Sequence, residues 1–223
     1  KVGLFFPMHA FRLPLACIEF LKTFRFLTAD YIFSVVTRGG APTRMHCEID
    51  RHLHKQGLSL NAFTYLTTPN TFDILYKVHE GSEMQEARAS IDHDIKIFTE
   101  RVNQRDNFID KGYRNRFFEI VFFPFLKWLN RKTGYFRLQN AFYSDDSCTG
   151  CGICSKLCLS NKIKMEHSRP QWQKNIQCDY CLACIQLCPE KAVQVKNSKT
   201  PEFDRIFCED VDWKEISDQK SLQ

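Results

Sequence analysis

The sequence predicts two folded parts, an α/β domain followed by a small α+β domain. Within residues 1–110, short apolar runs of strand length alternate with segments of helical periodicity, and this order is typical of α/β domains. Eight cysteines then follow in two evenly spaced groups, and that stretch repeats itself after thirty residues. We expect the α/β domain at 1–110, a basic aromatic helical linker at 111–140, the small domain at 141–197 and a polar tail at 198–223.

Three apolar runs predict the strands of the α/β domain. Val2–Phe6 and Tyr31–Val36 are almost entirely apolar, as in strands that are buried on both faces of a parallel sheet. Leu60–Leu66 is less apolar, so we expect this strand to lie nearer an edge of the sheet.

Three helices are predicted to connect these strands. Pro14 suits the first turn of a helix that runs to about Leu27, and a second helix begins after Pro42 and ends at Gly57, which can form its C-terminal cap. The third helix begins with the capping box of Ser82 and Gln85. We expect this helix to bury the apolar side chains that recur every three or four residues, which are Met84, Ala87, Ile91, Ile95, Phe98 and Val102.

The small domain is organised by two cysteine motifs, each with the spacing C-x2-C-x2-C-x3-C. Three cysteines of such a motif can bind three irons of one four-iron cube, while the fourth binds the other cluster in two-cluster ferredoxins. The curled backbone also forms a nest of N–H groups that favours a negatively charged cluster. The spacing therefore predicts two [4Fe–4S] clusters, the first bound by Cys148, Cys151, Cys154 and Cys188 and the second by Cys178, Cys181, Cys184 and Cys158.

Zinc is the alternative metal for paired cysteines, but a zinc site needs two pairs and has no use for a third cysteine in each motif. The internal repeat also favours the clusters, because a shift of thirty residues places Phe142 on Trp172 and Ile163 on Val193. So small a domain has little apolar core, and we expect the clusters to supply its folding energy. One departure is that Leu159 follows Cys158 where Pro189 follows Cys188. We expect that end to be looser or its cluster shifted in potential.

A resemblance to a known family rests on the two cluster motifs together with FFPMHAFRLP after the first strand and VVTRGGAP after the second. The chain resembles, over nearly its whole length, the ferredoxins fused behind a flavodoxin-like domain. This resemblance implies a partial flavodoxin-like parallel sheet followed by a bacterial 2[4Fe–4S] ferredoxin-like domain. It also implies an FMN site, placed at Pro7, Met8, His9, Ala10, Phe11, Thr37, Arg38, Gly39 and Gly40.

The residue types at these two loops suit a flavin. Gly39 and Gly40 let backbone N–H groups approach a flat ligand, Phe11 or His9 could stack on a ring face, and Arg38 could offset the charge of a reduced flavin. The family begins, however, with a strand and a loop that hold the FMN phosphate at a helix N-terminus, and this sequence starts at the equivalent of the third strand. We expect an N-terminal truncation, because three strands alone leave an apolar edge exposed. The alternative is an incomplete sheet that binds flavin weakly or not at all.

The charge distribution bears on partners. The chain has a formal net charge of +5, yet residues 144–223 carry 11 basic against 12 acidic residues before any cluster adds negative charge. This balance argues against nucleic acid as a partner. Residues 111–137 carry seven basic and nine aromatic residues. We favour a linker whose aromatics bridge the two domains, and the alternative is a basic amphipathic surface for an acidic partner or a membrane.

Cellular location follows from the cysteines and the apolar runs. Iron–sulfur clusters need a reducing compartment, and no apolar run in the sequence is typical of a signal peptide or a membrane span. We therefore expect a cytoplasmic protein. Of the cysteines outside the motifs, Cys17 and Cys47 are expected to be structural thiols, and Cys208 an ordinary thiol in an acidic, mobile tail.

These patterns predict an electron carrier that joins one-electron chemistry at the clusters to the chemistry of FMN and meets a redox partner protein. One alternative is a flavin-dependent reductase that acts on a small molecule through its clusters. Another is a redox-sensing or assembly module without flavin. No catalytic residue is predicted, and a carrier is favoured over an enzyme.

Overall fold

The computed structural model describes residues 1–25, 29–39, 43–69, 82–111, 121–122, 124–125, 128–129, 132, 138–198 and 212–221. The chain divides into two compact units. The first contains the described residues through Trp128, and the second contains those from Leu129 onward. Most of the predicted linker, together with Gly40 and Cys208, lies outside the described residues.

The first unit is built on a parallel sheet with the strand order β1-β2-β3-β4. The three predicted strands are confirmed as β1 (Val2–Pro7), β2 (Ile32–Arg38) and β3 (Ala62–Thr67). The sequence analysis did not predict β4 (Phe108–Ile109), because two residues are too few to show a pattern. This sheet is consistent with the expected α/β class.

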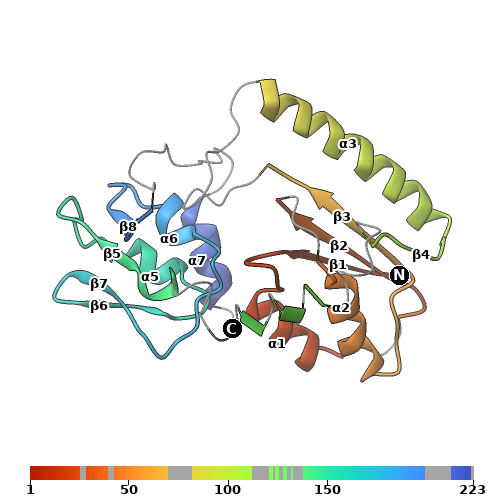
Figure 1. Ribbon diagram of the computed structural model, residues 1–223, viewed down its shortest axis with the longest axis horizontal. Coiled ribbons are helices and arrows are strands. Elements are labelled where there is room, and N and C mark those ends of the chain that lie inside the picture. The colour runs from red at the N-terminus through yellow and green to blue at the C-terminus, as the bar shows by residue number, and fades with distance from the viewer. Residues whose placement is uncertain are drawn as a thin grey trace. The chain divides into compact units, whose positions relative to one another are not determined.

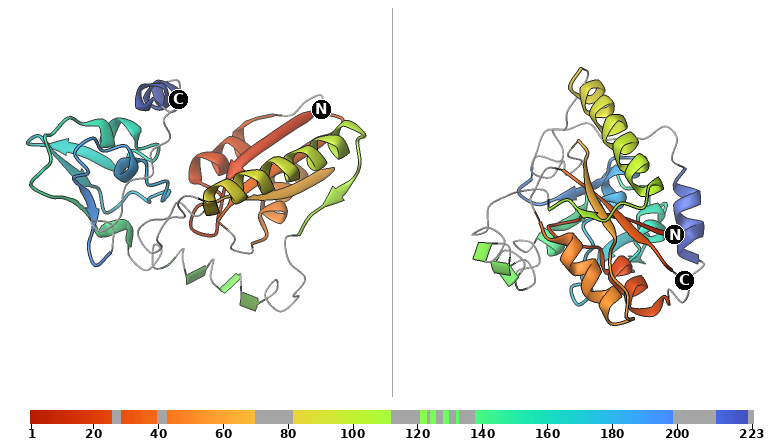
Figure 2. Two further views of the ribbon diagram at one scale, coloured as in Figure 1. Left: turned by 90° about the horizontal axis from the view of Figure 1, so that it is seen from above. Right: turned by 90° about the vertical axis from the view of Figure 1, so that its right-hand side faces the viewer.

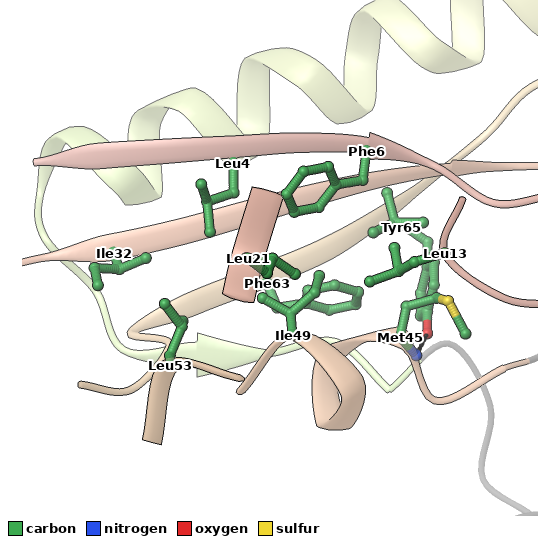
Figure 3. Close-up of a cluster of buried hydrophobic side chains, with 11 residues drawn as sticks. Leu4, Phe6, Leu13, Leu21, Ile32, Met45, Ile49, Leu53, Phe63 and Tyr65 are labelled. Atoms are coloured by element: carbon green, nitrogen blue, oxygen red, sulfur yellow. Dashed lines mark hydrogen bonds between the residues drawn. The ribbon is translucent and has the colours of Figure 1, made fainter. Parts of the chain in front are cut away.

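The helices cover both faces of this sheet. Within the first unit, α1 (Leu15–Thr23) and α2 (Met45–His54) lie on one side, and α3 (Ser82–Asn103) lies on the other (Figures 1 and 2). Figure 3 shows the core beneath α1 and α2, which consists of Leu4, Phe6, Leu13, Leu21, Ile32, Val36, Met45, Ile49, Leu53, Phe63 and Tyr65. The smaller core beneath α3 consists of Tyr31, Val35, Ala62, Phe98 and Val102.

The end of α2 confirms the role predicted for Gly57. This glycine has a φ of 74°, in the left-handed region. Its N–H donates to the His54 carbonyl at 3.1 Å, and the next N–H, from Leu58, donates to the Leu53 carbonyl at 3.1 Å. This pair of bonds is a Schellman motif, which satisfies carbonyls that the helix leaves without partners.

The apolar stripe of α3 is only partly buried. Phe98 and Val102 are buried as predicted, but the prediction for Ile95 is wrong, since 42% of this residue is exposed. The reason is length: at 1.5 Å per residue the 22 residues of α3 span about 33 Å, whereas a six-residue strand spans about 20 Å. Only the C-terminal part of the helix has sheet beneath it. The side chain of Met84 lies outside the described residues.

The second unit contains two short antiparallel strand pairs. One pair is β5 (Phe142–Ser144) with β8 (Val193–Val195), and the other is β6 (Ile163–Glu166) with β7 (Arg169–Trp172). In the chain, one short helix, α5 (Ile153–Leu157), lies between β5 and β6, and another, α6 (Ala183–Gln186), lies between β7 and β8. A 3-10 turn, η2 (Leu138–Asn140), precedes β5. Each cysteine motif therefore comprises a loop and a short helical turn with strands beside it.

The polar tail is more ordered than expected. Residues Trp213–Ser221 form α7, which contacts α5, and the ammonium of Lys156 lies 5.6 Å from the centroid of the Trp213 ring. The sequence analysis did not predict this helix. The sequence does carry a signal for this helix, because Asp212 Oδ1 accepts the N–H of Lys214 at 2.9 Å, as an N-cap residue does. In the part of the chain described here, no helix is both long and apolar enough to cross a membrane.

Candidate functional site

The eight motif cysteines line two cavities in the second unit. The first cavity, of about 340 Å³ including space that is open to solvent, has Cys148, Cys151, Cys154 and Cys188 in its wall. The second, of about 410 Å³ on the same basis, has Cys158, Cys178, Cys181 and Cys184 in its wall. Each cavity thus takes three cysteines from one motif and the fourth from the other. This grouping is the one expected if the motifs exchange their fourth ligand, although ligation itself stays a prediction.

Left-handed residues curl each motif around its cavity. Gly152 has a φ of 77° directly before α5, and Leu182 has a φ of 58° directly before α6. Gly150 and Tyr180 form a second pair thirty residues apart in this conformation, with φ of 74° and 53°. The internal repeat is therefore present in the backbone as well as in the sequence, even where the residue types differ.

Hydrogen bonds after the fourth cysteine of each motif follow the same repeat. The N–H of Asn161 donates to the Cys158 carbonyl at 3.0 Å, and the N–H of Lys191 donates to the Cys188 carbonyl at 3.0 Å. The two halves also meet at equivalent residues, because the rings of Phe142 and Trp172 stack with centroids 6.1 Å apart. Such self-contact indicates that the halves are related by an approximate twofold axis.

Burial and neighbouring cysteines raise the pKa of several of these thiols. The pKa of Cys154 is raised to about 11, chiefly by burial, with Cys188, Cys151 and Cys148 acting in the same direction and the Ser155 N–H acting to lower it. Burial likewise raises the pKa of Cys178 to about 12, with Cys181 and Cys158 acting in the same direction. The interacting neighbours are members of the same cavity. Because metals bind thiolates, loading either cavity must release protons.

Backbone N–H groups reduce the free-energy cost of forming a thiolate at two of these sulfurs. The N–H of Tyr180 donates to Cys178 Sγ at 3.3 Å, and the N–H of Ala192 donates to Cys188 Sγ at 3.3 Å. Hydrogen bonds of this kind favour the thiolate and influence the potential of an iron–sulfur cluster.

The donor set fits a cluster with several metal atoms. Among the described residues, no three Cys, His, Asp or Glu side chains are placed so that they could hold a metal ion. A mononuclear zinc site gathers all its ligands on one ion, whereas a four-iron cluster binds each thiolate at a different iron. Each cavity has four thiols in its wall, the number that one four-iron cluster would bind.

The loops predicted to bind flavin lie side by side in the first unit. Pro7 lies opposite Thr37 at the carboxyl ends of β1 and β2, and the N–H of Met8 donates to the Thr37 carbonyl at 2.9 Å. The chain then turns sharply, with Ala10 at a φ of 47° and Phe11 at 63°. Two successive non-glycine residues in this region cost about 1 kcal/mol each. Such strain is often found at binding and catalytic sites.

The turn at Ala10 and Phe11 is closed on both sides. The backbone N–H groups of His9 and Arg12 each donate to the other residue's carbonyl at 3.0 Å. A two-residue loop with both φ angles positive has the form of a type I′ turn, which normally contains Asn or Gly. The segment is therefore held in a defined shape at the end of the strand where parallel sheets bind ligands.

The side chain of Arg38 lies against the sheet. Its guanidinium is 4.1 Å from the centroid of the Tyr65 ring, and its Nε donates to Thr67 Oγ1 at 3.5 Å. Sequence reasoning missed Tyr65, whose hydroxyl donates to the Thr43 carbonyl at 2.7 Å. No sequence spacing relates Tyr65 to Thr43, because the two residues lie 22 positions apart in the chain. Gly39 is exposed, and Gly40 lies outside the described residues.

The described cysteines outside the motifs belong to the first unit. Cys17 packs against its main core, in agreement with the structural role expected for it. Cys47 lies on α2 and accepts a hydrogen bond from Arg44 Nη2 at 3.3 Å. Neither lies in the unit that contains the two cavities.

Comparison of the chain with protein-family models, with curated proteins and with solved structures found no match. The function is therefore inferred from the residues and geometry of this chain.

Proposed function

We propose that this protein is an electron-transfer protein that carries two [4Fe–4S] clusters in its second unit. The first cluster is held by Cys148, Cys151, Cys154 and Cys188, and the second by Cys158, Cys178, Cys181 and Cys184. The observation that carries the proposal is that each set lines one cavity. Cysteines twenty or more residues apart come together there in the grouping that two-cluster ferredoxins use.

The clusters supply one-electron chemistry, and the chain supplies thiolates, amide donors and apolar walls. Apolar side chains line both cavities, including Leu157 and Ile163 at the second and Ile153 and Val193 at the first. Cys154 from the first set and Cys184 from the second pack into the same apolar cluster. The two sites are therefore close to each other, which favours passage of single electrons between them.

We further propose that the first unit is flavodoxin-like and takes an FMN-type flavin at residues 7–11 and 37–40. The adjacent carboxyl ends of β1 and β2 and the strained turn at Ala10 and Phe11 support this proposal. A protein with both groups would exchange electrons with a redox partner protein through a transient interface.

The first test is the iron, sulfide and flavin content of the protein, purified without oxygen. We expect about eight iron and eight sulfide per chain, as two four-iron clusters require. Flavin in equal amount to the chain would support the FMN site, and its absence would limit the proposal to the clusters. Zinc in place of iron would overturn the proposal.

Exchange of the fourth ligand is tested by Cys188→Ala. We expect this variant to lose the cluster built on Cys148, Cys151 and Cys154 and to retain the other, as followed by iron content and by EPR of the reduced protein. The matched control is Cys47→Ala in the first unit, which should retain both clusters. Loss of the Cys178 motif's cluster from the Cys188→Ala protein would contradict the assignment.

A further inference from the structure

Lys162 is a buried cation in the wall of the second cavity. Only 1% of this residue is exposed, and no other lysine or arginine of the described residues is buried to this extent. It lines the cavity together with all four cysteines of the second set. Taking an ammonium group out of water is costly, so its position beside the cavity needs an explanation.

Two carbonyl groups solvate part of the Lys162 ammonium. Its Nζ donates to the carbonyl of Gln173 and to that of Ile176, both at 2.6 Å. These acceptors satisfy two of the three N–H donors but carry no net charge. Burial lowers the pKa of Lys162, while Cys178 and Cys158 act to raise it, which places the ammonium within electrostatic range of two cysteines of the second set.

Among the described residues, the wall of the first cavity contains no such cation. The thirty-residue repeat places Ala192 at the position equivalent to Lys162, and Ala192 is fully buried as well. The described charged residues of these walls are Glu190 at the first cavity and Asp179 with Lys162 at the second. Asp179 is buried and acts on Cys181, so it lowers the potential that Lys162 raises.

We propose that Lys162 sets the reduction potential of the second cluster and holds it above the value that a neutral residue would give. This inference rests on the proposed function. Reduction adds one electron, and thus one negative charge, to the cluster. A fixed positive charge in a surrounding of low dielectric stabilises the reduced form more than the oxidised form. The two halves of the repeat would then hold chemically identical clusters at potentials that are adjusted separately.

The test compares Lys162→Met with the unmodified protein in an anaerobic redox titration with a chemical reductant as the electron source. The paramagnetically shifted methylene protons of the coordinating cysteines report each cluster separately by NMR. In Lys162→Met, we expect the ratio of oxidised to reduced second cluster at a given potential to rise at least tenfold. This change corresponds to a potential lower by about 59 mV for a one-electron couple. The first cluster serves as an internal reference and should not shift.

Three further variants separate charge from structure. Lys162→Arg retains the charge and should stay near the unmodified potential, and Asp179→Asn should shift the second cluster upward. Lys164→Met removes an exposed lysine two residues away on β6 and should shift neither cluster. A fully loaded Lys162→Met protein with an unmoved second cluster would overturn the proposal, as would an equal shift of both clusters.

Lys162 could instead serve only to hold the loop that carries Gln173 and Ile176. Lys162→Ala tests this alternative, because alanine already occupies the equivalent buried position in the other half. Loss of the second cluster from both Lys162→Met and Lys162→Ala would assign the residue to that structural role and overturn the proposal. Absence of iron and sulfide from the unmodified protein would instead be a failure of the proposed function.

Discussion

The two units of this chain have different kinds of core. The main core of the first unit contains eleven buried side chains, all of them apolar or aromatic. The corresponding cluster of the second unit contains seven, one of which is Cys154, and Cys158, Cys184 and Cys188 complete its surface. Apolar burial contributes about 25 cal/mol per Å², so the larger core favours folding of the first unit. We expect the second unit to depend on what its cysteines bind.

The backbones of the two units also differ in how many non-glycine residues have a positive φ. Among the described residues, three non-glycine residues of the first unit have positive φ, whereas the second unit has seven, namely Asn161, His167, Ser168, Tyr180, Leu182, Lys191 and Asn197. Each costs about 1 kcal/mol. The free-energy cost of curling the chain this tightly around two cavities must be offset by other interactions, and a small core does not provide enough of them. Bound metal is a known source of such stabilisation.

Removal of iron is expected to have the largest effect. Treatment with a chelator after oxidation should unfold residues 138–198 and leave the first unit folded, because the two cavities lined by four thiols each, as far as the chain is described, lie in the second unit. Amide hydrogen exchange followed along the chain would measure this difference, with the first unit as internal control. Protection of the β5–β8 and β6–β7 pairs without iron would show that apolar packing is sufficient.

Truncation of the main core of the first unit should have the next largest effect. Ile49 is fully buried on α2, and Ile49→Ala should lower the free energy of unfolding of the first unit by about 2–5 kcal/mol. The same substitution at Ile97, which is 45% exposed on α3, should change it by less than about 0.5 kcal/mol. Thermal unfolding measures both. Iron content should stay unchanged, and its loss in Ile49→Ala would show that the units depend on each other.

A pair of glycine substitutions should give the smallest effects. Gly57 and Gly150 share a φ of 74°, but a Cβ at Gly57 meets no atom within 4 Å, whereas one at Gly150 would lie 2.5 Å from the Ser168 carbonyl oxygen. Gly57→Ala should therefore cost about 1 kcal/mol for the backbone conformation alone. Gly150→Ala should cost more and should also speed loss of the first cluster, measured as bleaching of visible absorbance. Equal effects on the free energy of unfolding would mean that the Ser168 loop can move to make room for the added methyl group without loss of stability.

Local patterns predicted much of the first unit and failed where length or distant packing decided the outcome. The strands were identifiable because each is a short apolar run, and Gly57 was identifiable because helix ends have characteristic residues. The exposure of Ile95 could not be predicted, since it depends on how far the sheet extends beneath α3. Tyr65 was missed because its partners, Arg38 and Thr43, lie more than twenty residues away in the chain.

The sequence by itself determined the two cysteine motifs, their thirty-residue repeat and the alternation of strands and helices, because spacing and periodicity are properties of neighbouring residues. The spacing also predicted how the cysteines are grouped, and the tertiary structure shows how two loops close over each other so that each predicted set lines one cavity. The tertiary structure alone decided that Lys162 is buried beside the second set, while its equivalent, Ala192, leaves the first cavity with no lysine or arginine among the described residues of its wall. A lysine in a sequence is most often a solvated residue, and only the packing around it shows otherwise.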